Sequence, residues 1–295
     1  MLIRLFTLFF MIQFTAFYSQ NASYVINGDA SGINITGPDG TVNCNCFQLT
    51  PDQNAQVGSV WNENMINLRQ DFRLEFDVYL GTRDGGGADG IAFGLQPINT
   101  SIGNSGGGLG MQGVSPSVGV YLDTYRNGNN SDPNDDHISI NLNGNLTHTS
   151  SNNVAGPNNL PNIEDGNWRR LIVDWDASVT RLNVFFVNTS TPELTYTSDI
   201  VSNVFSGDSL VFWGFTGSTG GSRNLQKFCT VSDLEAPEIT SCPSNVTLQN
   251  SPGDCYRNYS YSAVTASDNC GVFNINQVSG LPSGSNFPVG TTENI

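Results

Sequence analysis

A dense group of oxygen-bearing residues lies in residues 120–138, which read V-Y-L-D-T-Y-R-N-G-N-N-S-D-P-N-D-D-H-I. This segment offers the carboxylates of Asp123 and Asp132, the side-chain amide of Asn127 and the backbone carbonyl of Tyr125. Calcium takes about six to eight oxygen ligands from carboxylates, amides, carbonyls and water, and a short glycine-containing loop lets such groups converge. The segment therefore predicts a calcium site, against the alternative of a solvated acidic turn.

An EF-hand loop is the competing calcium motif, because Asp123, Asn127 and Gly128 fall at its first, fifth and sixth positions. The rest of the pattern does not match. The twelfth position, which calls for a bidentate Glu, is Asn134, and the third position is Tyr125. Strand-like sequence flanks the loop instead of helical sequence, so an EF-hand is not predicted.

The elements that must position this loop have the patterns of β-strands. Their apolar and polar residues alternate, and Gly, Asn or Asp bounds them. Short alternating strands at this spacing predict an antiparallel sandwich or barrel. Long loops on such a rigid scaffold are where binding residues usually lie. The expected strands are residues 72–80, 118–123, 137–142, 168–175, 181–187 and 210–215.

The charge balance narrows the possible partners. Acidic residues outnumber basic residues by 26 to 11, although charged residues make up only 13% of the chain. An acidic surface repels phosphate backbones and anionic membranes, which argues against nucleic-acid binding. Such a surface suits divalent cations and neutral ligands.

Four motifs follow one another within residues 40–230. They are A-D-G-I-A-F-G-L (residues 88–95), G-G-G-L-G (residues 106–110), the segment of residues 123–137, here called the metal loop, and W-G-F-T-G-S-T-G-G (residues 213–221). Together they resemble the L-type, legume-lectin-like family, and the metal loop reproduces that family's spacing from its first Asp to the His that follows the D-P pair. The resemblance implies an all-β, concanavalin A-like jelly-roll β-sandwich that binds carbohydrate with the help of calcium.

The resemblance gives a carbohydrate-binding role to residues in each motif. Asp89 and Asn127 would hydrogen-bond sugar hydroxyls, and the Gly107 amide would donate to one of those hydroxyls. The ring of Tyr125 would stack on the apolar face of the sugar. Gly221 would lie in the loop that sets specificity.

The resemblance also implies metal ligands, with one departure from the family. The family's second, transition-metal site uses a Glu two residues before the first calcium Asp, and that position is Tyr121 here. A site without this anionic ligand would bind manganese weakly. We therefore expect Ca²⁺ and no Mn²⁺ or other transition metal. The metal-site residues implied are Asp123, Tyr125, Asn127, Asp132 and His137.

A glycoside hydrolase of the laminarinase type is the enzyme alternative, because it shares the sandwich architecture. Retaining hydrolysis needs two carboxylates about 5 Å apart, commonly from an E-x-D-x-x-E strand. Glu75 and Asp77 begin that pattern, but Leu80 stands where the acid/base Glu should be. We therefore predict that the chain is not an enzyme. A structural adhesion domain without a sugar site is the third alternative, and Asp89 beside the calcium loop disfavours it.

The N-terminus predicts export. Arg4, an apolar run over residues 5–17 and small or polar residues near Ser19 form a signal peptide over residues 1–20. The protein would then be secreted or displayed at the cell surface. Cysteines in an exported chain favour disulfides. Since C-N-C at residues 44–46 is too tight to bridge internally, one of its two cysteines should bond Cys229.

The C-terminal part follows a composition break at residues 233–243, and strand-like runs lie at residues 245–249 and 259–265. Its motifs are P-E-I-T-S-C-P (residues 237–243), Cys255, S-D-N-C-G (residues 267–271) and L-P-S-G-S-N-F-P-V-G-T-T (residues 281–292). These motifs resemble a hyalin-repeat (HYR) domain. We therefore expect a lectin-like domain at residues 21–234 and, at residues 235–295, an incomplete immunoglobulin-like β-sandwich. The resemblance implies a Cys255–Cys270 disulfide that leaves Cys242 unpaired, and we expect this part to be the most easily proteolysed.

The sequence as a whole predicts a non-catalytic, calcium-dependent carbohydrate-binding module. Its expected partners are glycans, and its expected role is in cell adhesion. Neither nucleic-acid binding nor membrane insertion is expected. The shape of the loops around residues 101–113 and 217–224 would decide which sugar is bound.

Overall fold

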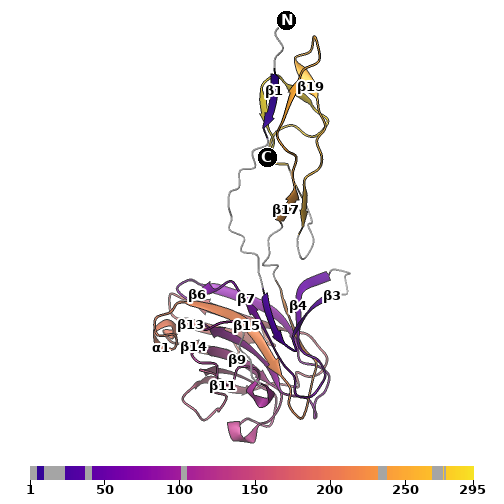
Figure 1. The fold of residues 1–295 in the computed structure, drawn as a ribbon. Coiled ribbons are helices and arrows are strands. Elements are labelled where there is room, and N and C mark those ends of the chain that lie inside the picture. The colour runs from indigo at the N-terminus through magenta and orange to yellow at the C-terminus, as the bar shows by residue number, and fades with distance from the viewer. Residues whose placement is uncertain are drawn as a thin grey trace. The chain divides into compact units, whose positions relative to one another are not determined.

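The computed structural model describes residues 5–9, 24–36, 42–100, 105–231, 238–267, 275 and 277–295. The chain forms two compact units (Figure 1). One is Ala22–Asp233, and the other combines Met1–Asn21 with Leu234–Ile295. The predicted boundary after residue 234 lies outside the described residues.

The larger unit is built from two antiparallel sheets, which confirms the predicted all-β sandwich. In spatial order the first sheet contains β11 (Asn153–Asn159), β10 (His137–Leu142), β9 (Val118–Asp123), β8 (Gly90–Gln96), β15 (Leu210–Ser218), β5 (Val57–Asn62) and β2 (Tyr24–Gly28), with β6 (Ile66–Asn67) paired to β15. The second contains β14 (Leu194–Thr197), β13 (Arg181–Phe186), β12 (Arg169–Asp176), β7 (Phe72–Tyr79), β16 (Gln226–Thr230), β4 (Val42–Thr50) and β3 (Ser31–Thr36). In the described connections lie the short helices η1 (Gly106–Gly108), η2 (Gly128–Asn130) and α1 (Ile200–Asn203).

Strand alternation decides which side chains enter the core. In β7 the apolar residues Phe76 and Val78 are buried, while Glu75 and Asp77 point to the other face and stay partly exposed. Since successive side chains of a strand face opposite sides of the sheet, this pattern places the core between the two sheets.

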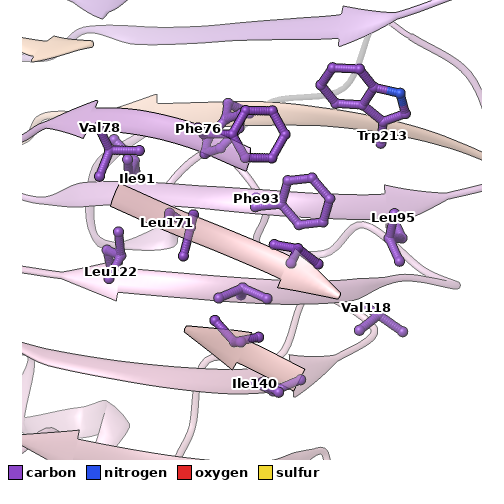
Figure 2. Packing of buried hydrophobic residues seen from close by; sticks show 14 of the residues in the cluster. Phe76, Val78, Ile91, Phe93, Leu95, Val118, Leu122, Ile140, Leu171 and Trp213 are labelled. Atoms are coloured by element: carbon purple, nitrogen blue, oxygen red, sulfur yellow. The ribbon is translucent and has the colours of Figure 1, made fainter. Parts of the chain in front are cut away.

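Aromatic rings from both sheets meet in that core (Figure 2). The ring of Phe76 in β7 lies 5.7 Å from that of Phe93 in β8 and 5.5 Å from that of Trp213 in β15, centroid to centroid. Buried rings of this size contribute much of the apolar area that stabilises a domain. The sheets therefore form a rigid support for the loops at their edges.

A disulfide joins β4 to β16 in the second sheet. Cys46 and Cys229 are paired across the two strands and bonded to each other. This confirms the prediction that residue 44 or 46 bonds Cys229, and identifies Cys46 as the partner. The side chain of Cys44 lies outside the described part of the chain.

The described residues of the smaller unit form three short groups of strands. The predicted strand at residues 245–249 is confirmed as β18, whereas the prediction at 259–265 was wrong. A strand precedes that run and another begins at its last residue. The strands are β1 (Leu5–Phe9) between β18 (Val246–Gln249) and β22 (Thr291–Glu293), β17 (Glu238–Ser241) with β20 (Thr265–Ser267), and β19 (Tyr256–Asn258) with β21 (Asn286–Pro288).

The Cys255–Cys270 disulfide implied by the HYR resemblance is not formed. Cys255 carries a free thiol and is exposed, as is the strand β19 that directly follows it. Cys270 lies outside the described residues. Cys242 also carries a free thiol, as expected.

The segment predicted to be a signal peptide includes β1, which pairs antiparallel with β18 and parallel with β22. Its removal stays a prediction. No helix in the described part of the chain combines the length and the apolar character needed to cross a membrane.

Candidate functional site

The ends of three neighbouring strands bring the predicted site residues to one edge of the first sheet. Gly90, the first residue of β8, pairs with Asp123, the last residue of β9, and with Ser218, the last residue of β15. Because all three strands are antiparallel to their neighbours, the segments just outside them meet at this edge. Asp89, the metal loop after Asp123 and the loop after Ser218 are therefore adjacent.

Hydrogen bonds from two loops hold the backbone of Asp89. Its amide donates to the Ser218 carbonyl at 2.9 Å, and its carbonyl accepts from the Thr124 amide at 3.1 Å. The Ala88–Asp89 peptide bond is cis. The carboxylate is free to bind a ligand, because Oδ2 is buried and accepts no hydrogen bond from the described residues. Burial raises the pKa of Asp89 to about 6.

The metal loop is closed by two carboxylates that accept backbone amides. Asp123 Oδ1 accepts from the Tyr125 amide at 3.0 Å, and Asp132 Oδ2 accepts from the Asn127 amide at 2.6 Å. Both aspartates are buried. Desolvation raises the pKa of Asp123 well above its usual value, and the neighbouring charge of Asp132 raises it further. The loop thus concentrates negative charge away from water.

The loop's oxygen atoms fit a calcium ion. Oδ1 of Asn127 is buried and makes no hydrogen bond within the described part of the chain. Oδ1 of Asp132 is also buried and lies 3.3 Å from Nε2 of His148. A buried polar atom without a partner costs free energy, so the Asn127 oxygen favours a ligand, and the Asp132 oxygen has a second lone pair to offer one. Carboxylate and amide oxygens are the donors that a hard cation prefers. Asp123, the Tyr125 carbonyl, Asn127 and Asp132 are therefore suited to hold calcium.

Glycines let the surrounding loops approach the polar residues. A Cβ at Gly107 in η1 would lie 2.5 Å from Oδ1 of Asn127, and one at Gly220 would lie 3.3 Å from Oδ2 of Asp89. Gly221, the predicted residue of this loop, instead accepts a hydrogen bond from the Asn54 side chain through its carbonyl. The backbones of the loops that contain Gly107 and Gly220 can therefore come close to a ligand bound by Asp89 and Asn127.

Tyr125 provides an apolar surface beside these polar groups. Its side chain is 41% exposed although its backbone is held by Asp123. An exposed aromatic ring can pack against the C–H face of a sugar, since it has an apolar body. The structure thus brings Asp89, Gly107 and Asn127 together, with the Tyr125 ring open to solvent.

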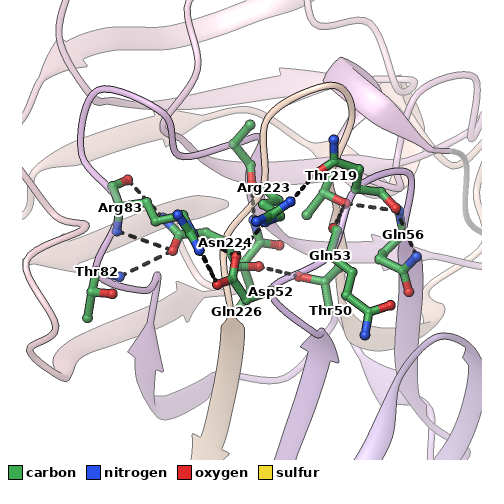
Figure 3. A network of polar contacts seen from close by, with 12 residues as sticks. Thr50, Asp52, Gln53, Gln56, Thr82, Arg83, Thr219, Arg223, Asn224 and Gln226 are labelled. Atoms are coloured by element: carbon green, nitrogen blue, oxygen red, sulfur yellow. Dashed lines mark hydrogen bonds and ion pairs between the residues drawn. The ribbon is translucent and has the colours of Figure 1, made fainter.

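A second layer of polar contacts supports the loop that follows β15 (Figure 3). The Asn224 side chain accepts from the Thr82 amide at 3.2 Å and donates to Glu164 at 2.6 Å. Gln226 donates to the carbonyl of Ala88 at 3.1 Å, directly before Asp89. Burial raises the pKa of Glu164 to about 8. Asn224 ends one of the loops expected to set specificity, but its contact with Glu164 was not predicted from the sequence, since Glu164 lies outside the recognisable motifs.

His148 is a further residue that sequence analysis missed as a possible ligand. Its Nε2 lies 3.0 Å from Nε2 of His137 and 3.3 Å from Oδ1 of Asp132. The sequence did contain a signal that could have pointed to His148, because His137 and His148 are the only two histidines of the chain and lie 11 residues apart. Burial lowers the pKa of His137, which favours the neutral ring that a metal requires.

The carboxylates considered for glycoside hydrolysis are engaged in ion pairs on the second sheet. Glu75 contacts Arg73 at 2.9 Å and Arg170 at 3.0 Å, and Asp77 contacts Arg170 at 2.7 Å. Hydrogen bonding to Arg73 lowers the pKa of Glu75. Leu80, at the position of the missing acid, is buried in the core. Glu75, Asp77 and their arginine partners therefore form a polar surface on the second sheet.

Two protein-family models match the chain. The legume lectin beta-barrel domain matches residues 17–232, and the HYR domain matches residues 232–295. Among curated proteins, pesticidal crystal protein Cry22Aa of Bacillus thuringiensis is 27% identical, over 63% of this chain and 29% of that protein. The basic agglutinin of Psophocarpus tetragonolobus is 28% identical, over 60% of this chain and 70% of the agglutinin. The chain thus spans less than a third of the crystal protein's length.

Solved structures of lectins share the fold of the larger unit. The metal-free lectin I-B4 of Griffonia simplicifolia has a TM-score of 0.53 at 21% identity, covering 74% of this chain and 93% of that lectin. The Ca²⁺/Man-bound VIP36 exoplasmic/lumenal domain has a TM-score of 0.52 at 17% identity, covering 70% of this chain and 80% of that domain. These similarities confirm the predicted concanavalin A-like jelly roll.

Proposed function

The chain belongs to the legume L-type lectin family, and we propose that it is a non-catalytic protein that binds carbohydrate in a calcium-dependent manner. One observation carries the proposal. Asp89 and Asn127 each keep a buried side-chain oxygen without a hydrogen bond in the described part of the chain, at the same sheet edge. Such oxygens are costly unless a ligand supplies their partners.

Sugar hydroxyls have the chemistry that these oxygens need. Ionised Asp89 would accept hydrogen bonds from adjacent hydroxyls, and bonds to a charged acceptor are stronger than neutral ones. Asn127 and the Gly107 amide would complete the polar contacts, while the ring of Tyr125 would cover the apolar face of the sugar. A neutral ligand also suits a chain with a formal net charge of -15.

Calcium would act through the shape of the loop. Bound calcium supplies positive charge that offsets the two buried carboxylates. Asp123 and Asp132 would hold the ion and keep Asn127 and Tyr125 in their binding orientation. A loop that is ordered before the sugar arrives binds more tightly, because less conformational entropy is lost on binding.

The alternatives have less support. Retaining hydrolysis needs two carboxylates that are free to react, whereas Glu75 and Asp77 are both paired with arginine. A purely structural adhesion domain would not need the buried, unpaired oxygen of Asp89. The HYR match and the predicted signal peptide favour an extracellular or surface-displayed protein that uses the lectin unit for adhesion.

A glycan array tests the function directly. The full chain should bind a restricted group of glycans in calcium and lose that binding in a chelator. The array should include glycans ending in galactose, N-acetylgalactosamine and mannose, because related lectins have been solved with these sugars. Binding to no glycan in calcium would contradict the proposal.

A further inference from the structure

The two histidines of the chain form a buried pair beside the metal loop. Their Nε2 atoms lie 3.0 Å apart, and the side chains of His137 and His148 are only 2% and 7% exposed. Two carboxylates face the pair. Oδ1 of Asp132 lies 3.3 Å from Nε2 of His148, and Oδ2 of Asp123 lies 3.9 Å from Nε2 of His137.

Backbone contacts set this arrangement. His137 begins β10 and pairs directly with Asp123 at the end of β9. The His148 amide donates to the carbonyl of Asn130 in η2 at 2.9 Å, which ties the turn between β10 and β11 to the metal loop. Asn153 Nδ2 lies 2.8 Å from Nδ1 of His148 and restrains the ring. The histidines are therefore brought together by the fold of the chain.

Tyr121 leaves this space open to His148. It is the residue that replaces the family's anionic ligand, and its ring packs back over Gly119, where a Cβ would lie 2.7 Å from the hydroxyl oxygen. The ring belongs to a separate apolar cluster with Trp61 and Met111. No residue of β9 thus replaces the family's Glu ligand, but His148, in the turn between β10 and β11, offers a nitrogen ligand.

We propose that His137, His148, Asp132 and Asp123 form a transition-metal centre that prefers zinc to manganese. Zinc binds imidazole and carboxylate with bond lengths of about 2.0–2.2 Å, so neighbouring ligands of a tetrahedral site lie about 3.3 Å apart. The separations of 3.0 Å and 3.3 Å are close to that value. The three ligand atoms of Asp132, His137 and His148 all lie within 4.8 Å of one another.

The donor types explain the preference. Manganese favours sites rich in carboxylate, carbonyl and water oxygen, whereas imidazole suits zinc. A second imidazole in place of a Glu moves the donor set from oxygen toward nitrogen. The sequence-based expectation of no transition metal rested on the carboxylate ligand that is lost at Tyr121. It did not include the imidazole ligand that His148 offers.

The outer ring nitrogen of His137 is placed for a metal site. It lies 3.3 Å from the Asp135 carbonyl, which would accept its proton and leave the Nε2 lone pair for a metal. Nδ1 of His148 contacts Nδ2 of Asn153, which also donates to Oδ1 of Asn141 at 3.3 Å. Metal binding by Nε2 of His148 therefore requires the Asn153 amide to turn its oxygen toward the ring, where it would accept the proton on Nδ1.

Ring-nitrogen NMR of the full chain tests the centre without a mutation, because two histidines give two sets of signals. In saturating calcium, one equivalent of zinc should shift the Nε2 resonance of both rings. Calcium alone should shift neither resonance to the metal-bound position. A zinc shift of one ring only, or of neither ring, would overturn the proposal.

Variants test which residues hold the ion. By calorimetric zinc titration, His148→Ala should weaken binding by more than about 100-fold, since loss of an outer partner alone costs about 10–100-fold. Asn153→Ala should fall in that smaller range, and Asn152→Ala is the matched control. Unchanged zinc affinity in His148→Ala, or tighter binding of manganese than zinc by the unmodified chain, would contradict the assignment. Since these readouts do not involve sugar, they stay independent of the proposed carbohydrate binding.

Discussion

The Thr124 amide donates a 3.1 Å hydrogen bond to the carbonyl of Asp89. Thr124 directly follows Asp123, which we propose as a calcium ligand, and Asp89 is the proposed sugar ligand. The two sites therefore share a direct backbone contact. A change in the order of the metal loop should reach the sugar site through this bond.

We predict that calcium raises the melting temperature of the larger unit. Without an ion, the buried carboxylates of Asp123 and Asp132 repel each other. An ion that binds only the folded state adds about 2.7 kcal/mol to the free energy of unfolding when its free concentration is 100 times its Kd. Differential scanning calorimetry with calcium and with chelator measures this shift.

Two variants control for general effects of charge. Asp132→Asn should remove most of the calcium-dependent shift. Asp174→Asn should retain it, because Asp174 lies on the second sheet and makes only a 4.0 Å contact with Arg73. A melting temperature that is the same in calcium and in chelator would count against the calcium site.

We predict that Asp89→Ala abolishes sugar binding and leaves calcium binding intact. The variant removes the carboxylate but keeps the backbone bonds to Ser218 and Thr124. Two calorimetric titrations of the variant, one with a glycan selected on the array and one with calcium, would measure its affinity for each ligand. Asp84→Ala is a control in the preceding loop. Sugar binding by Asp89→Ala at the original affinity would contradict the role of Asp89.

The sequence revealed the features that depend on local pattern. Alternation predicted β7, β9 and β10 closely, and four ordered motifs identified the lectin family. The proximity of His148 to His137 was not predicted, although the two histidines were visible in the sequence, because it depends on a tertiary contact from the His148 amide to Asn130. The contact between Asn224 and Glu164 was not predicted for the same reason, since they meet across distant loops. The choice of Cys46 over Cys44 also required the register of β4 against β16.

Glu164 should make the stability of the larger unit depend on pH. Its pKa is raised from 4.5 to about 8, mainly by desolvation, with further contributions from Asp136 and Asp84, while Asn224 opposes the rise. The folded chain therefore keeps a proton that the unfolded chain releases. The free energy of unfolding should fall between about pH 4.5 and pH 8 by an amount on the order of a few kcal/mol.

Glu164→Gln should flatten this pH dependence, since an amide does not titrate. Urea unfolding at several pH values would measure the slope. Glu193→Gln is the matched control because Glu193 also accepts a hydrogen bond from an asparagine side chain, that of Asn158. An unchanged slope in Glu164→Gln would contradict the role of this carboxyl.

We predict that the Cys46–Cys229 disulfide is a major source of stability. It closes a loop with a sequence separation of 183 residues. In the chain-entropy description, closing a loop of that length lowers the entropy of the unfolded chain and so adds about 5 kcal/mol to the free energy of unfolding. Removal of a native disulfide commonly lowers the free energy of unfolding by about 2–5 kcal/mol. Replacing both cysteines by Ala should lower the denaturant midpoint accordingly. Cys255→Ser, at an exposed free thiol, should leave it unchanged.

The central claim is that calcium and sugar binding are coupled through the loop at residues 123–132. The most direct test is calorimetric titration of one array-selected glycan into the full chain after chelation, and again after calcium is restored. We expect no measurable binding after chelation and full recovery of affinity with calcium. Equal affinity in the two titrations would contradict the account.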